Sequence, residues 1–199
     1  MQPATAQPDN PFSAFRELSR PEKWWVIGHL FIAKKTFDIS QQSLQTAREV
    51  KNSDLLDGDL KGGQADAFKH SYWMARLTQE INPRKARRLG KAHEKGDYLQ
   101  YKKKLRKGKT TTHDKAATQM DLFNNEIGID IGMEFRDALP QELKEIIISA
   151  IRRGQMRILK KDTSGNFLDE NGEIIPEKKY LNKWDNEKVL VPSNETPKK

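Results

Sequence analysis

The chain has 199 residues, enough for one domain with a sizeable hydrophobic core. Its net charge of +8 and charged fraction of 32% favour anionic partners such as nucleic acid, phospholipid headgroups or cell-wall polymers, although a solvated lysine-rich surface has the same composition. The absence of cysteine excludes a disulfide framework and thiol catalysis.

The N-terminal segment 1–18 contains three prolines and predicts a flexible arm. It lacks the basic start and apolar stretch of a secretory signal, so we expect a protein that is cytoplasmic as made, with any export through a specialised secretion system. Ser19 and Glu22 then have the spacing of a capping box and predict the start of a helical domain over 19–154.

The apolar run 24–33 lies in the first helix of this domain and is too short to span a bilayer. We therefore expect no transmembrane segment. Trp24 and Trp25 are expected to pack in the core, and a membrane-facing position is the alternative.

Further along the chain, the block 84–109 is strongly basic. It predicts either a solvated flexible loop between two helices or a contact with an anionic polymer or membrane. After residue 154 the spacing of apolar residues changes from helical to strand-like. Residues 155–194 therefore predict a β-hairpin and a C-terminal strand, and 195–199 are expected to form a tail.

Three polar clusters interrupt the amphipathic helices, and each has apolar neighbours typical of a buried face. Asp66 and His70 are four residues apart and share one face of a helix. The other two clusters are His93-Glu94 and Asp121-Leu122-Phe123-Asn124-Asn125. Gly128 and Gly132 continue the face of Asp121 and would allow a close helix approach. Buried polar groups are costly unless they satisfy one another, a metal or a substrate, so the clusters predict an interior site.

Several kinds of chemistry suit such a site: metal-assisted hydrolysis, direct acid–base catalysis, and glycan cleavage with Glu94 as a general acid. A polar network that only ties helices together is the structural alternative. A zinc-protease helix is excluded, because Asp97 stands where that motif has its second histidine. The candidate catalytic residues are Asp66, His70, His93 and Glu94, the candidate substrate-binding residues are Lys69, Asn124 and Asn125, and the candidate ligands of a divalent metal are Asp66, His70, His93 and Asp121.

The clusters also resemble a known pattern. The stretches 63–73, 92–94 and 120–128 are similar to D-A-F-R-H-A-x-W, H-E and M-D-x-x-N-N-x-x-G in a widespread bacterial domain family of unknown function. The resemblance extends over roughly residues 20–194, with Lys69 and Ser71 at positions where the family usually has arginine and alanine. Members resemble secreted and toxin-like proteins. The resemblance therefore implies one shared site and an effector-like role, with a cognate inhibitor as a partner.

Together these patterns predict a mainly α protein, a single helical-bundle domain with a small C-terminal β-hairpin. The favoured function is a bacterial effector-like hydrolase, with a divalent metal as candidate cofactor and a phosphodiester, phospholipid or peptidoglycan as substrate. The alternative is a non-enzymatic module that docks on nucleic acid or an anionic membrane through the 84–109 block. The oligomeric state and the bond cleaved stay open.

Overall fold

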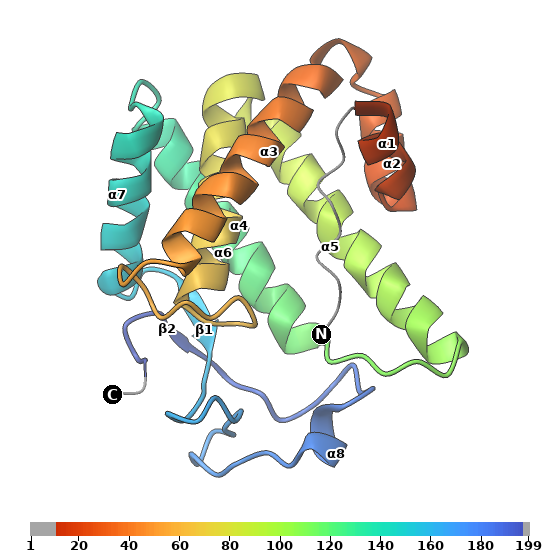
Figure 1. Cartoon of the computed structure of the whole chain (residues 1–199), viewed down its shortest axis with the longest axis vertical. Helices are drawn as coiled ribbons and strands as arrows, with labels where there is room; N and C mark the ends of the chain where they lie inside the picture. Colours follow the sequence, from red (N-terminus) through yellow and green to blue (C-terminus); the bar gives the residue numbers. More distant parts are fainter. Residues whose placement is uncertain (1–10, 197–199) are drawn as a thin grey trace.

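The computed structural model describes residues 11–196, and this part of the chain is mainly helical (Figure 1). Its helices are α1 (Pro11–Glu17), α2 (Arg20–Ile27), α3 (Leu30–Lys51), α4 (Gln64–Ile81), α5 (Pro83–Arg106), α6 (Lys115–Glu134), α7 (Pro140–Arg152) and α8 (Glu177–Tyr180). Two short strands, β1 (Arg157–Leu159) and β2 (Leu190–Pro192), pair antiparallel near the C-terminus. The predicted fold class is confirmed. None of the described helices is long and apolar enough to cross a bilayer.

Helix α4 lies at the centre of the bundle and packs against α3, α5, α6 and α7. Phe68, Met74 and Leu77 are fully buried on its different faces. One hydrophobic cluster joins α4 to α3, α7 and β1, and a second joins it to α2, α5 and α6. Because α4 is covered on several sides, the polar groups it carries are also removed from water.

The described part of the chain begins with helix α1. Helix α1 lies within the segment predicted to be a flexible arm, of which residues 1–10 lie outside the described range. The capping box at the start of α2 is present: Glu22 Oε2 accepts from the Ser19 backbone N–H at 2.8 Å, and Ser19 Oγ accepts from the Glu22 N–H at 3.4 Å. Trp25 is buried, but the prediction that Trp24 packs in the core is wrong, since its exposed fraction is 69%.

The basic block 84–109 is not a flexible loop between helices, because α5 continues without a break to Arg106. Two glycines inside α5 are explained by close contacts. A Cβ at Gly96 would lie 2.3 Å from Ser19 Oγ, and one at Gly90 would lie 3.1 Å from Met74 Sδ. Glycine at these positions lets α2 and α4 pack closely against α5, so the helix retains residues that otherwise weaken helices.

The two paired strands of the C-terminal β element are further apart in the sequence than the strands of the predicted hairpin. β1 pairs with β2, and Ile158 lies opposite Val191. The segment between them makes isolated bridges, Lys161 with Phe167 and Leu168 with Ile174. The pairing after the second bridge ends at Ile175, whose N–H donates to the Phe167 carbonyl at 2.8 Å, because α8 begins at Glu177.

Candidate metal centre

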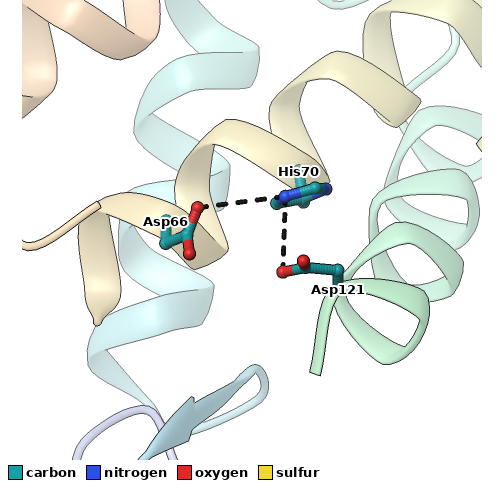
Figure 2. A group of neighbouring side chains, drawn as sticks. All are labelled: Asp66, His70 and Asp121. Atoms are coloured by element: carbon teal, nitrogen blue, oxygen red, sulfur yellow. Dashed lines mark ion pairs between the residues drawn. The ribbon is translucent and has the colours of Figure 1, made fainter. Parts of the chain in front are cut away.

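His70 is buried on α4 between two carboxylates (Figure 2). Asp66 lies one helical turn earlier, with its Oδ1 3.9 Å from His70 Nε2. Asp121 comes from α6, and its Oδ1 lies 3.3 Å from the same nitrogen. One ligand atom from each of these three residues lies within 4.8 Å of the others. An imidazole and two carboxylates this close together have the ligand types that a divalent transition metal or zinc prefers.

Glu94 of α5 approaches the opposite edge of the His70 ring, with its Oε1 3.8 Å from His70 Nδ1. Several buried polar atoms of this group have no hydrogen-bond partner within the described part of the chain: His70 Nδ1, both Glu94 oxygens, Asp121 Oδ1 and both amide atoms of Asn125. Such atoms destabilise a folded protein unless something else satisfies them. The composition of the site therefore favours a bound ion or a polar ligand.

The pKa values of the site follow from this burial. Burial lowers the pKa of His70 well below its ordinary value, and the adjacent Lys69 lowers it further. Burial raises the pKa of Asp121 well above its ordinary value, with added repulsion from Asp66 and Glu94. Burial likewise raises the pKa of Glu94 to about 7. His70 is thus held as the neutral imidazole that binds metals, and a bound cation would relieve the repulsion among the carboxylates.

Asp66 has more hydrogen-bond donors around it than the other carboxylates of the site. Its Oδ2 accepts from the backbone N–H of Gly62 at 2.9 Å, and its Oδ1 accepts from Lys69 Nζ at 2.6 Å. Burial disfavours the charged form of Lys69, but the charge of Asp66 outweighs it and raises the Lys69 pKa. Lys69 therefore stays charged at the edge of the site, where it neutralises part of the carboxylate charge.

His93 lies beside this group but contacts other carboxylates. Its Nδ1 is 2.8 Å from Glu22 Oε1, its Nε2 is 3.9 Å from Asp97 Oδ2, and its ring centroid is 6.3 Å from that of His70. Burial opposes protonation, but the hydrogen bond to Glu22 and the nearby carboxylates raise the pKa of His93 to about 9. The compact group of ligand atoms forms without His93. Its assignment as a ligand or base stays a prediction.

The two asparagines of the third cluster have different surroundings. Asn124 donates through Nδ2 to the Arg157 carbonyl at 2.9 Å and accepts through Oδ1 from the Arg157 N–H at 2.9 Å, so it pairs with β1 as a neighbouring strand would. The Asn125 side chain faces α5, where a Cβ at Gly90 would lie 3.3 Å from Asn125 Nδ2. Substrate binding stays a prediction for both residues. Both amide atoms of Asn124 are used in hydrogen bonds to the Arg157 backbone.

A cleft of about 1230 Å³, lined by residues of α1 to α5, extends to this site. Its wall includes Lys69, His70, Trp73 and His93. Basic residues outnumber acidic ones among the described residues that line it: Arg16, Arg20, Lys23, Lys34, Arg48, Lys69, Lys103 and Arg106 against Glu17, Glu22 and Asp97. A basic cleft that reaches a polar site favours an anionic ligand.

Two features of the site were not predicted from the sequence. Glu22 was expected only as a capping residue, yet one of its oxygens caps α2 and the other contacts His93, 71 residues away. The buried hydroxyl groups of Thr36 and Ser43, residues that line the cleft, have no partner within residues 11–196. Nothing in the local pattern of the sequence connects these residues to the clusters.

The three clusters fall within one recognised family. Residues 23–155 match the sequence model of a domain of unknown function (DUF6973). The chain belongs to this family. The DUF6973 match includes Asp66, His70, Glu94 and Asp121 and ends before β1. No curated protein and no solved structure matches the chain.

Proposed function

We propose that this DUF6973 protein is a hydrolase that depends on a divalent metal and acts on an anionic substrate, with Asp66, His70 and Asp121 as the protein ligands. The observation that carries the proposal is the compact set of three ligand atoms, all within 4.8 Å of one another and supplied by two helices. The basic cleft that reaches His70 supports an anionic substrate, with phosphodiesters and phospholipids ahead of peptidoglycan.

Each protein group has a task in this proposal. When bound, a divalent ion supplies positive charge for polarising the scissile group and lowers the pKa of a bound water. His70 binds through Nε2, while Glu94 beside Nδ1 orients the ring. Because its pKa is about 7, Glu94 can hold or release a proton at neutral pH. Lys69 lines the cleft next to Asp66 and can pair with an anionic group of the substrate.

The alternatives fit the geometry less well. Glu94 as the general acid of a glycan hydrolase is disfavoured because Glu94 is not among the residues that line the cleft, whereas His70 and Lys69 are. In the binding-module alternative the basic block would be an external contact surface, but Lys103 and Arg106 of that block line the same cleft. The effector role and the cognate inhibitor implied by the motif resemblance stay predictions.

The metal part is tested on protein stripped with a chelator and titrated with Zn²⁺, Mn²⁺, Mg²⁺ or Ca²⁺ by calorimetry and thermal melting. We expect one ion per chain and a raised Tm for at least one of these metals. His70→Ala and Asp121→Asn should lose that binding. Lys69→Gln, the matched control, should keep it, because Lys69 neutralises Asp66 without offering a ligand. Equal metal binding by His70→Ala would rule out this centre.

The hydrolase part is tested with the metal-loaded protein on bis(p-nitrophenyl) phosphate, on phosphatidylglycerol in mixed micelles and on peptidoglycan. We expect metal-dependent cleavage of a phosphodiester. Loss of Glu94, which orients His70, should lower the rate about 10–100-fold, and loss of a ligand residue should lower it further. A protein that binds the metal at this site but cleaves none of these substrates would leave a structural metal centre and refute the proposed activity.

A further inference from the structure

Four large apolar side chains are exposed where helices α2 and α3 meet. Trp24, Ile27, Leu30 and Phe31 have exposed fractions of 69%, 49%, 68% and 105%, and we call this group the α2–α3 corner. Single exposed apolar side chains are ordinary, but four of them within eight residues form a patch. Such patches mark interaction sites with proteins or membranes.

The corner is held in place by the residues between its exposed side chains. Trp25 is buried and donates through Nε1 to the Lys85 carbonyl of α5 at 3.2 Å. His29 stacks on Trp25 with ring centroids 4.4 Å apart, and its Nδ1 lies 2.7 Å from the Trp25 carbonyl oxygen. Trp25 and His29 thus fix the turn between the helices from the inside, so Trp24 and Phe31 are presented outward.

Basic residues accompany the apolar ones at a spacing of one helical turn. The pairs are Arg20 with Trp24, Lys23 with Ile27, Leu30 with Lys34, and Phe31 with Lys35. Lys34 and Lys35 also pair with acidic residues, Asp38 and Glu80, both at 2.7 Å. Over residues 20–38 the balance is four Lys or Arg against Glu22 and Asp38, which is 4 − 2 = +2.

We infer that the α2–α3 corner docks on an anionic phospholipid bilayer, with its apolar side chains at the boundary between headgroups and acyl chains and its basic residues among the headgroups. Aromatic and aliphatic side chains bordered by lysine and arginine are the usual composition of interfacial membrane contacts. A second copy of the chain is a poorer partner, because it would bring the same positive charge to the contact.

The corner also adjoins the cleft. Leu30, which belongs to the corner, and its neighbours Lys23 and Lys34 line the cleft that extends to His70. A docked molecule would therefore present its cleft to the membrane surface. The inference itself does not depend on the proposed hydrolase activity, since it rests on exposed side chains outside the candidate metal centre.

The test is co-sedimentation of the full chain with vesicles of phosphatidylcholine alone and of phosphatidylcholine with phosphatidylglycerol. We expect binding to the anionic vesicles that weakens with salt, and a loss of roughly tenfold or more in the partition coefficient for Trp24→Ser/Phe31→Ser. Leu139→Ser/Ile174→Ser is the matched control, since those side chains are 64% and 58% exposed and lie outside the corner. In Figure 1, α7, which follows Leu139, lies on the opposite side of the molecule from α2.

Sedimentation velocity on the same proteins tests whether the corner binds a second copy of the chain instead of a membrane. A monomeric wild type that binds anionic vesicles through the corner supports the inference. Equal binding by the corner variant and the control variant would overturn it. So would a wild-type dimer that the corner variant converts to a monomer without a change in vesicle binding. Circular dichroism of each variant verifies that a loss of binding is not a loss of fold.

Discussion

Gly128 on α6 lies directly against the backbone of Ser71 on α4. A Cβ at Gly128 would lie 2.2 Å from the Ser71 carbonyl oxygen, closer than any real side chain can approach. Gly132 repeats the arrangement one turn later, at 2.6 Å from the Ala75 carbonyl oxygen. The two helices can therefore approach closely, and this approach brings Asp121 of α6 next to His70 of α4.

Replacing Gly128 by Ala should force α4 and α6 apart. We expect a loss of about 3 kcal/mol in the free energy of unfolding, as overpacking in a close-packed core requires the backbone to move, together with weaker metal binding. Gly28→Ala is the control, because a Cβ there would make ordinary contacts of 3.6 Å. Urea unfolding of both variants measures the difference. Equal stability of the two variants would show that α4 and α6 can move apart at little cost in free energy.

The close approach of α4 and α6 is also where sequence reasoning worked best. The spacing of Asp66 and His70 places both on one face of a helix, and Gly128 continues the face of Asp121. These patterns depend on helical periodicity, which is local, and they predicted that the clusters share an interior. The capping box at Ser19 is equally local, and it too is present.

Contacts between segments that are distant in the sequence could not be predicted. The contact of Glu22 with His93 joins residues 71 positions apart, and the exposure of Trp24 depends on where α2 meets α3. A flexible loop between helices was one of the two alternatives for the basic block 84–109, yet α5 continues to Arg106. In the folded protein, Gly96 is needed for the close contact with Ser19, so tertiary packing outweighs local propensity.

Variants of the two asparagines of the third cluster test which of them stabilises the fold and which belongs to the candidate metal centre. Asn124→Ala removes two hydrogen bonds to the Arg157 backbone inside the protein, so we expect a loss of about 2–4 kcal/mol in stability with little change in metal affinity. Asn125→Ala should be less destabilising, because the Asn125 side chain lies beside His70 and, unlike that of Asn124, pairs with no backbone group. Thermal unfolding and calorimetric metal titration of both variants measure these quantities. A reversed order of stability would contradict the assigned roles.

His93 should give the protein a pH-dependent stability on the alkaline side. Its folded-state pKa of about 9 lies above the ordinary value of 6.5, so the stability contributed by its charged form is complete below pH 6.5 and is lost as the pH rises through 9. Glu22→Gln removes the charged partner and should lower the His93 pKa, which flattens this decline. The matched control is Glu17→Gln, which removes an exposed carboxylate from α1.

The measurement is an NMR titration of the imidazole Hε1 signals, with His93 assigned from the spectrum of His93→Gln. We expect a midpoint of about 9 in the wild type and in Glu17→Gln, and a clearly lower one in Glu22→Gln. A midpoint near 6.5 in the wild type would mean that the contact with Glu22 does not form in solution.

The pKa of Glu94 is also raised, but by burial rather than by a charged partner. The folded-state pKa of about 7 exceeds the ordinary 4.5, so the metal-free protein should lose about 3 kcal/mol of stability as the pH rises from 4.5 to 7, when Glu94 must ionise inside the fold. Glu94→Gln cannot ionise and should be more stable than the wild type at pH 8. Glu170→Gln, an exposed change, should follow the wild type.

Chemical unfolding between pH 4 and 8, with and without a metal that binds, measures both effects. In the wild type the metal should reduce the loss above pH 4.5, because a cation beside Asp121 offsets the repulsion that ionised Glu94 adds there. Parallel pH profiles for the wild type and Glu94→Gln would show instead that water or a local rearrangement solvates this carboxylate. The carboxylate cluster would then lack the buried repulsion that makes a cation favourable.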